Sequence, residues 1–282
     1  MIAFDSHAHI ISDDHEKYRP DPLSGSLRPG DLDNPVTAEK LLKFMDENGV
    51  ERALLVQRAH VYGFNNDYVV DCAQRYPDRF RAMCMVNALD PNVAQQVRHW
   101  VNRGAVAIRV TEPHKGMDNS WFSSPQALTM WETANELGIS VRLHFYRWNR
   151  AQCLPDVKPL VERFARMTVV LDHLSNLSAE EGPPNYGADE LLRGLAALPN
   201  LYLLFATINL GPLAAKDIPA APVIAHLAKL FGANRMMWGS DIAQSPGTYA
   251  QMRAMADAAV SGVNGEEQRQ MLRDTGTSVY WR

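Results

Sequence analysis

Short apolar runs alternate with stretches of helical periodicity along the whole chain. Three of the runs, 53–56, 106–108 and 169–171, contain no polar residue. Apolar runs of this length between helical stretches are typical of parallel strands that helices cover on both faces. The pattern predicts eight strands, each followed by a helix. The expected strands are 2–6, 52–57, 80–87, 105–110, 139–145, 168–173, 201–206 and 235–240, and the expected helices lie near 37–48, 66–76, 91–103, 125–137, 155–166, 188–198, 219–231 and 246–260.

The number of repeated units favours a closed barrel over an open sheet. The chain has 282 residues, close to the roughly 250 residues of a typical (β/α)8 barrel. We therefore expect an α/β fold, a single-domain (β/α)8 TIM barrel over residues 1–282. Thr37 is the expected cap of the first helix, and Ser124-Pro125 opens the fourth, with proline at the first helical position. Two long stretches, 10–35 after the first strand and 175–187 after the sixth, are expected to form loops at the barrel mouth, where function commonly resides.

The composition excludes several classes of partner. The chain has 28 basic and 32 acidic side chains, a net charge of −4, so it lacks the basic surplus of nucleic-acid-binding proteins. No apolar run reaches the ~20 residues of a membrane span, and no basic-then-apolar leader precedes the first strand. We expect a cytoplasmic protein in which Cys72, Cys84 and Cys153 are reduced thiols. A homo-oligomer remains open.

Four histidines and one aspartate stand at the ends of expected strands. His7 and His9 end the first strand and, two residues apart, point to the same face. His144, His173 and Asp241 end the fifth, sixth and eighth strands. A single histidine at a strand end is more often a packing residue, but this set meets at one point if the barrel closes. The other histidines are assigned to packing or to the surface: His15, His60, His99, His114 and His226.

Together these residues resemble the amidohydrolase superfamily, and within it the amidohydrolase-2 branch of lactone hydrolases and non-oxidative decarboxylases. The resemblance covers essentially the whole chain. Its segments are Asp5-Ser6-His7-Ala8-His9, His144, Val170-Leu171-Asp172-His173-Leu174 and Met237-Trp238-Gly239-Ser240-Asp241. Two further segments, 55–57 and 62–66, are similar to those of the lactonases around 2-pyrone-4,6-dicarboxylate lactonase.

The resemblance implies a site for one divalent metal ion. His7, His9 and His144 would supply three nitrogen ligands, with Asp241 as a fourth ligand or a neighbour. Asp241 would also activate the attacking water, and His173 or the metal would polarise the carbonyl of the substrate. Zinc is the expected ion, with manganese as an alternative. Operation without a metal stays open, because the pyrone lactonase of this family works without one. That enzyme lacks the histidine on the fifth strand, so the presence of His144 favours a metal in this chain.

Arginines gather at or just beyond the expected strand ends, which indicates an anionic small-molecule substrate. Guanidinium groups bind carboxylates through paired hydrogen bonds. Arg109 is the first candidate for this contact, and Gln57 is a further substrate-binding candidate. Tyr146, Trp148 and Phe64 would form the walls around an unsaturated ring or pack against helices. Internal ion pairs with acids such as Glu112, Asp156 or Asp172 are the alternative role for two of the arginines, Arg142 and Arg150. The clustered arginines are Arg58, Arg109, Arg142, Arg147 and Arg150.

Three functions remain after these observations. The preferred one is metal-assisted opening of a lactone, such as a carboxylated pyrone or muconolactone or a sugar lactone. The alternative is non-oxidative decarboxylation of an unsaturated or aromatic acid on the same scaffold. A barrel that binds a ligand without turnover is the third, and the intact set of histidines and Asp241 disfavours it.

Overall fold

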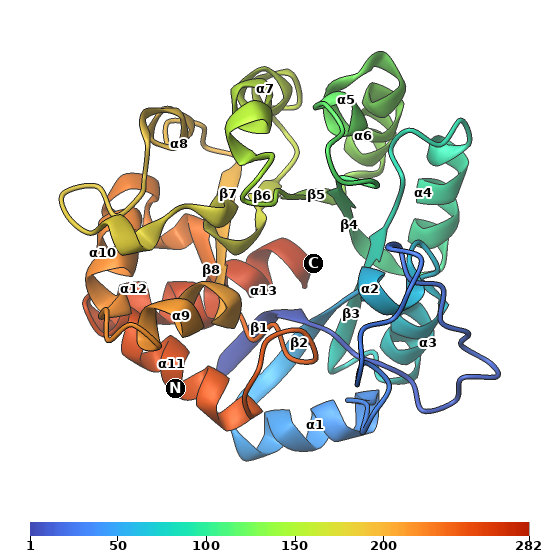
Figure 1. Cartoon of the computed structure of the whole chain (residues 1–282), viewed down its shortest axis with the longest axis horizontal. Helices are drawn as coiled ribbons and strands as arrows, with labels where there is room; N and C mark the ends of the chain where they lie inside the picture. Colours follow the sequence, from blue (N-terminus) through green and yellow to red (C-terminus); the bar gives the residue numbers. More distant parts are fainter. Residues whose placement is uncertain (282) are drawn as a thin grey trace.

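The computed structural model describes residues 1–281, which fold into a nearly closed barrel of parallel strands with helices around it (Figure 1). Each strand pairs with the next in sequence order, from β1 to β8. The backbone N–H of Asp241 donates to the carbonyl of His7 at 2.8 Å and links the last strand to the first. The strands are β1 (Ala3–Ala8), β2 (Val50–Val56), β3 (Phe80–Met85), β4 (Ala105–Thr111), β5 (Ser140–His144), β6 (Val169–Leu171), β7 (Leu201–Ala206) and β8 (Met236–Gly239).

The predicted alternation of strands and helices is confirmed in all eight units. The matching helices are α1 (Ala38–Glu47), α3 (Asp67–Arg75), α4 (Val93–Asn102), α6 (Pro125–Leu137), α7 (Arg150–Arg163), α8 (Glu190–Leu195), α10 (Ala220–Phe231) and α11 (Tyr249–Val260). Further short elements are α2 (Ala59–Tyr62), α5 (Ser120–Ser123), η1 (Asp172–Asn176), η2 (Ala179–Glu181), α9 (Thr207–Ala214), η3 (Ala233–Arg235), α12 (Gly265–Arg269), η4 (Gln270–Asp274) and α13 (Thr275–Tyr280).

Capping side chains fix where two of the helices begin. The hydroxyl of Thr37 accepts from the backbone N–H of Lys40, and that of Ser124 accepts from Ala127, as expected of N-caps. Helix α7 differs from the prediction: it begins at Arg150 rather than 155 and holds two prolines inside it. The sequence favoured a start at Pro155 because proline is common in the first turn of a helix.

Two apolar cores hold the barrel together. The larger one fills the space between the outer faces of the strands and the surrounding helices. The smaller one lies inside the barrel, where Phe4, Leu54, Met83 and Val170 meet Tyr280 of α13. Helix α13 closes this end of the barrel and is seen through the ring of strands in Figure 1. The interior is therefore a packed core at one end, and only the opposite end is free for a site.

Strand β6 is shorter than predicted, because the chain turns sharply after Leu171. His173, Leu174, Ser175 and Asn176 all have φ between 51° and 56°, in the left-handed region. Residues with side chains adopt this conformation at a cost, and such strain is found mainly at functional sites. The turn ends the strand and places His173 at the carboxyl end of the barrel. Among residues 1–281, no helix is long and apolar enough to cross a membrane.

Candidate active site

Strands β1 and β8 bring three of the predicted site residues into contact. The Nε2 atoms of His7 and His9 lie 3.1 Å apart. Oδ1 of Asp241 lies 3.6 Å from Nε2 of His7 and 3.5 Å from Nε2 of His9. All three residues are at most 3% exposed. Residues from opposite ends of the chain thus form one compact, buried group.

Asp5 holds this group in place through hydrogen bonds. Its Oδ1 accepts from the backbone N–H of His7 at 3.0 Å and from that of Ser240 at 2.8 Å, which ties β1 to the end of β8. Its Oδ2 accepts from the hydroxyl of Tyr249 at 2.9 Å, on helix α11. Burial raises the pKa of the Asp5 carboxyl. The sequence prediction did not assign a role to Asp5, although it opens the histidine motif.

Gly239 allows β8 to approach β1 at this point. A Cβ atom at residue 239 would overlap the Cβ of His7 and lie 2.8 Å from its backbone nitrogen. Asp241 follows with φ of 58°, in the left-handed region, and its Oδ2 accepts from the hydroxyl of Ser245 at 2.7 Å. The close approach and the turn together aim Oδ1 of Asp241 at the two imidazoles.

A second buried group lies beside the first, around Asp172. Its Oδ2 is 2.6 Å from Nε of Arg109, and its Oδ1 is 3.3 Å from Nε of Arg142 and 3.6 Å from Nδ1 of His7. Burial alone would raise the pKa of Asp172, but the two arginines outweigh it and hold the pKa well below its ordinary value. The internal ion pair that the sequence left open for Arg142 is therefore present. Arg150 pairs with Asp189 rather than with one of the acids named from the sequence.

The hydrogen bonds fix which nitrogen of His9 carries the proton, whereas His7 has a partner in either tautomer. Nδ1 of His9 donates to the carbonyl of Val56 at 2.7 Å, so Nε2 presents a lone pair. Arg142 Nη1, which can only donate, lies 2.9 Å from Nδ1 of His7. A neutral His7 then carries its proton on Nε2 and donates it to His9. Oδ1 of Asp172 offers a second acceptor at Nδ1 of His7, so the other tautomer of His7 also has a partner.

The charges in the group of His7, His9 and Asp241 suit a base rather than an acid. Burial lowers the pKa values of His7, His9 and His173, so these imidazoles are neutral near pH 7. Burial would raise the pKa of Asp241, but the neighbouring imidazoles of His9, His173 and His7 outweigh it and lower the pKa below its ordinary value. An ionised carboxylate surrounded by neutral imidazoles can accept a proton.

The same side chains offer the ligand atoms of a metal site. Two groups have ligand atoms within 4.8 Å of one another, and both consist of histidine and aspartate. Oδ1 of Asp241 and Oδ1 of Asp172 are buried without a hydrogen-bond partner, which is rare unless a ligand completes them. The residues therefore fit a divalent ion. The groups are His7, His9 and Asp241, and His7, Asp172 and His173.

His144 is placed next to these groups but belongs to neither. Its Nδ1 accepts from Nη2 of Arg109 at 2.8 Å, and its ring centre lies 5.3 Å from that of His173. Burial, together with the charge of Arg109, lowers the pKa of His144 well below its ordinary value. Its predicted role as a metal ligand stays a prediction, and the contact with Arg109 gives it a second function to consider.

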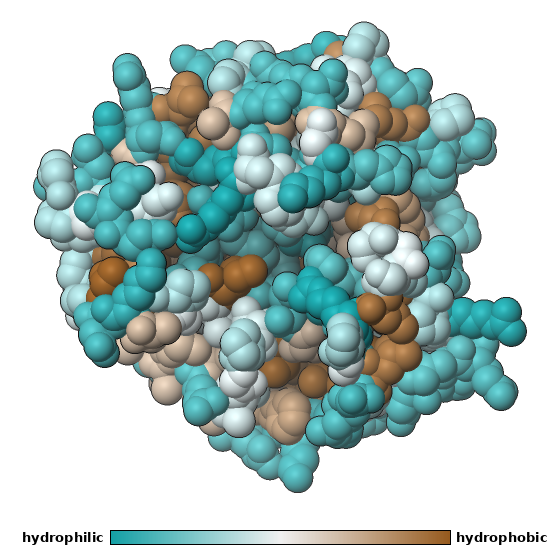
Figure 2. All heavy atoms as spheres, viewed as in Figure 1, coloured by the Kyte–Doolittle hydropathy of each residue, from teal (hydrophilic) through white to brown (hydrophobic). Residues whose placement is uncertain are grey.

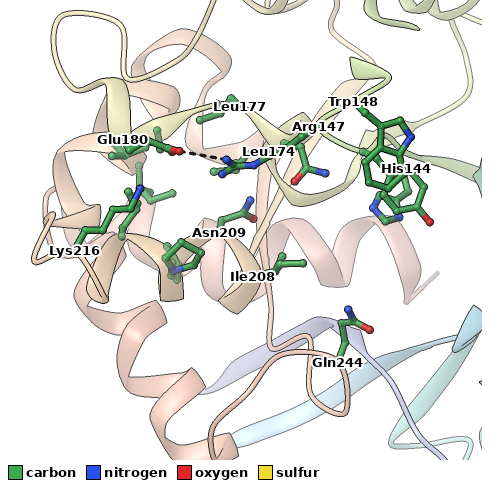
Figure 3. Close-up of a pocket in the computed structure, with 18 of the residues that line it drawn as sticks. His144, Arg147, Trp148, Leu174, Leu177, Glu180, Ile208, Asn209, Lys216 and Gln244 are labelled. Atoms are coloured by element: carbon green, nitrogen blue, oxygen red, sulfur yellow. Dashed lines mark hydrogen bonds and ion pairs between the residues drawn. The ribbon is translucent and has the colours of Figure 1, made fainter. Parts of the chain in front are cut away.

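A cavity of about 710 Å³ is lined by His144, whose ring neighbours that of His173. Figure 2 shows the hollow in the middle of this face of the molecule, and Figure 3 shows the side chains that line it. His144 and Gln244 line it, whereas His7, His9 and Asp241 are buried outside its lining. The longer loops after β1 and β6 both contribute, as predicted for the barrel mouth. Their lining residues are Arg28 from the first and Leu174, Asn176, Leu177, Ala179 and Glu180 from the second.

The predicted substrate residues divide between the cavity and the protein interior. Tyr146 and Arg147 line the cavity, and Arg147 reaches across to Glu180 at 3.3 Å (Figure 3). Gln57 is fully buried, and its amide donates to the carbonyls of Gly63 and Asn65, so it shapes the loop after β2.

Arg58 and Arg109 are both buried and both already hold internal partners. Arg58 donates from Nε to the carbonyl of Ala243 at 3.1 Å, and its Nη2 is 3.6 Å from Asp31. Arg109 holds Asp172 and His144, as described above. The internal contacts use only part of each guanidinium, because arginine has five N–H donors. The proposed contacts of both residues with a substrate remain predictions.

The sequence analysis gave no site role to three residues at the cavity. His60, assigned to packing or the surface, lines the cavity, and burial with the charge of Arg58 beside it lowers its pKa to about 3. Asn209 donates to the backbone carbonyl of His173 at 2.8 Å from helix α9, which was not expected. The Oε1 of Gln244 is buried without a partner. His60 stands two residues after a strand-end arginine, and that position was the available signal.

Comparison with known proteins identifies the family. The model of the family described as Amidohydrolase matches residues 4–280, nearly the whole chain. The chain belongs to the amidohydrolase family. This confirms the resemblance drawn from the strand-end residues, and the chain is an enzyme of the amidohydrolase superfamily. No match was found among curated proteins.

Solved structures of several enzymes share the barrel. A probable 2-pyrone-4,6-dicarboxylic acid hydrolase from Acinetobacter baumannii, solved with citric acid bound, is 20% identical, with full coverage of both chains and a TM-score of 0.78. An amidohydrolase from Burkholderia multivorans with bound zinc is 17% identical over 100% of this chain and 99% of its own, with a TM-score of 0.73. A 5-carboxyvanillate decarboxylase from Novosphingobium aromaticivorans with bound manganese is 12% identical over 100% and 97%, with a TM-score of 0.70. At these identities the likeness shows the fold alone.

Proposed function

We propose that this amidohydrolase opens the ring of an anionic lactone by adding water to its ester carbonyl. The observation that supports this most directly is the ionised, buried Asp241, whose Oδ1 faces the neutral imidazoles of His7 and His9 and has no hydrogen-bond partner. A carboxylate in this setting is suited to take a proton from water and to return it later. The cavity lined by His144 is large enough for a small organic substrate.

The proposed reaction assigns one proton relay to Asp241. Asp241 accepts a proton from water as the water oxygen bonds to the carbonyl carbon of the lactone. The ring C–O bond then breaks, and Asp241 returns the proton to the leaving oxygen, which leaves a hydroxy acid. His173 is the neutral imidazole that would polarise the carbonyl from the end of β6.

His7, His9 and Asp241 would hold a divalent ion, with zinc or manganese as candidates and His144 as a further ligand candidate. When bound, such an ion supplies positive charge that lowers the pKa of water to about 7 and stabilises developing negative charge. Operation without an ion stays open, since the arrangement of Asp241 and the imidazoles also serves as a base by itself. Metal analysis of protein purified without chelator or added metal distinguishes the two cases.

Positive charge around the cavity supports an anionic substrate. Arg28 and Arg147 line the cavity. Arg58 and Arg109 lie near His60, which also lines it. The guanidinium of Arg28 has no ion pair or hydrogen bond within residues 1–281. With a net charge of −4 for the whole chain, this local surplus of arginine is a specific feature of the mouth.

Decarboxylation of an aromatic acid is the second candidate, and one observation favours it. The ring of Tyr146 stacks on Trp148 with centres 4.2 Å apart, and its other neighbour is the ring of His144 at 4.7 Å. This stack reaches from the surface to the edge of the buried groups and would suit a flat aromatic ring.

The test compares two panels of substrates with purified protein. One panel contains pyrone, muconolactone and sugar lactones, followed by acid release in a weak buffer. The other contains hydroxylated aromatic acids, followed by release of carbon dioxide. We expect acid release from a lactone, absent in Asp241→Asn protein. Carbon dioxide release with no lactone opening would contradict the proposal in favour of the decarboxylase.

A further inference from the structure

His144 connects the buried polar groups with the cavity. Its side chain is partly exposed and lines the cavity, where Figure 3 shows it beside Trp148. On its inner edge, Nδ1 lies 2.8 Å from Nη2 of Arg109. Its backbone is paired with Thr111 of β4, whose hydroxyl donates to the carbonyl of His144 at 3.2 Å. The backbone and one ring nitrogen of His144 are therefore both held in place.

The contact with Arg109 decides which nitrogen of His144 carries the proton. A guanidinium group donates hydrogen bonds and never accepts them, so Nδ1 of His144 accepts and carries no proton. A neutral imidazole has a single N–H, which then lies on Nε2. Nε2 makes no hydrogen bond within residues 1–281, and it is not cut off from solvent as the unpartnered Nδ1 of His173 is. His144 therefore offers the cavity an accessible, unused N–H donor.

Arg109 is itself held by Asp172. Its Nε lies 2.6 Å from Oδ2 of Asp172, which is fully buried, and Arg109 is only 5% exposed. Because the guanidinium group is planar, partners at Nε and at Nη2 together fix its orientation. Asp172, Arg109 and His144 thus form a chain of hydrogen bonds that runs from the protein interior to the cavity.

This tautomer opposes a role for His144 as a metal ligand. A metal ion needs a nitrogen lone pair, but the lone pair on Nδ1 of His144 faces Arg109 and Nε2 carries the proton. His9 is the contrasting case, because its Nδ1 donates to the carbonyl of Val56 and leaves a lone pair on Nε2. Within residues 1–281, neither group of possible metal ligands includes His144. His9 therefore suits a metal ion, whereas His144 suits an acceptor oxygen.

We propose that Nε2–H of His144 donates to a carboxylate oxygen of the substrate, and that Arg109 is the positioning residue that holds this tautomer. Arg28 and Arg147 line the same cavity and favour a negatively charged acceptor. The ring of Tyr146, 4.7 Å from that of His144, would contact the body of an unsaturated acid. The inference rests on the proposed function only for the choice of an anionic substrate.

Nitrogen NMR of protein labelled at its histidines tests the tautomer without any ligand. Couplings between ring nitrogens and ring protons distinguish Nε2–H from Nδ1–H, and the His144 signals are assigned by their loss in His144→Gln. We expect only Nε2–H in the unmodified protein and a mixture of both tautomers in Arg109→Met. Arg103→Met is the control, since Arg103 also holds two aspartates but no histidine, and it should leave the His144 signals unchanged. If Arg109→Met fails to fold, Arg109→Lys serves in its place, because an ammonium group lacks the paired donors of a guanidinium.

Binding of benzoate, a simple aromatic carboxylate, tests the donor without turnover. The dissociation constant, measured by calorimetry, should rise about tenfold in His144→Phe, because a hydrogen bond to a charged acceptor is lost. His144→Gln returns an N–H donor to this position and should bind within about threefold of the unmodified protein. His99→Phe changes an exposed histidine of α4 and should bind as the unmodified protein does.

Three outcomes would overturn the proposal. One is an Nδ1–H tautomer of His144 in the unmodified protein, and another is equal benzoate affinity in the unmodified protein and in His144→Phe. The third is loss of the Nε2–H signal when zinc chloride is added, together with weaker zinc binding in His144→Gln, which would make His144 a metal ligand. The expected tautomer and benzoate results in a protein that opens no lactone would support the role of His144 and refute the proposed function alone.

Discussion

The two ends of the barrel interior are built from the same strands and have opposite chemistry. Toward the amino ends of the strands, Phe4, Leu54 and Met83 pack with Tyr280 in a dry core. Toward the carboxyl ends, His7, Asp172 and Asp241 are equally buried but charged or polar. The first arrangement gains stability from burial, whereas the second tolerates burial only because each charge has a partner or awaits a ligand.

Arg142 joins the two ends. Its Nη2 donates to the hydroxyl of Tyr280 at 2.5 Å, on the apolar side. Its Nη1 and Nε face His7 and Asp172 on the polar side. The side chain is fully buried. One arginine therefore connects the apolar core with the His7 ring and with Asp172.

The largest effect is expected on the polar side, at Asp241. Asp241→Asn removes the base but keeps the size of the side chain, so turnover should fall by about a thousandfold. The melting temperature should change little, because the side chain is a base rather than a packing element. Asp13→Asn, at an exposed aspartate of the loop after β1, is the control and should keep full activity. Unchanged turnover in Asp241→Asn would remove Asp241 from the mechanism.

The largest effect on stability is expected at Arg142, which connects the two ends of the barrel interior. Arg142→Met leaves Asp172 buried with one arginine instead of two, and breaking a buried ion pair in this way costs about 3–5 kcal/mol of unfolding free energy. Urea unfolding measures the loss. The control is Arg163→Met, since Arg163 forms an exposed pair with Glu132 that contributes at most about 1 kcal/mol. A similar, small loss in both variants would contradict the role given to Arg142.

A smaller loss of stability is expected at Gly239, where β8 approaches β1. Gly239→Ala forces a methyl group against His7, and overpacking of this kind costs about 1–3 kcal/mol. Because the methyl group displaces His7, turnover should fall more than the stability loss explains. Gly194→Ala, at a helical glycine with open space around it, is the control and should lower neither. Normal turnover in Gly239→Ala would show that the position of His7 is not critical.

The smallest effect is expected inside the apolar end. Met83→Leu conserves volume and should change the unfolding free energy by less than about 1.5 kcal/mol. Turnover per folded molecule should be unchanged, because Met83 packs within the apolar core inside the barrel. A strong loss of turnover with intact stability would contradict the claim that the apolar end of the barrel contributes to stability alone.

The sequence predicted the apolar features of this molecule better than its polar ones. Continuous apolar runs revealed all eight strands, and alternation along β1 and β8 placed His7, His9 and Asp241 at one end. The left-handed turn after Leu171 could not be predicted, because it depends on tertiary contacts rather than on glycine. The same holds for the contact of Arg109 with His144, which requires the register of β4 against β5.

The central claim is that Asp241 is an ionised carboxylate among neutral imidazoles. Carbon NMR of protein labelled at the aspartate carboxyl groups tests it, with the signal of Asp241 assigned by its loss in Asp241→Asn. Because the pKa of Asp241 is lowered from its ordinary value of 3.8, its signal should show no titration while the pH falls from 8 to about 4. A titration midpoint above 3.8 would show that burial dominates, that Asp241 holds a proton more tightly than an exposed aspartate, and that the proposed base is wrong.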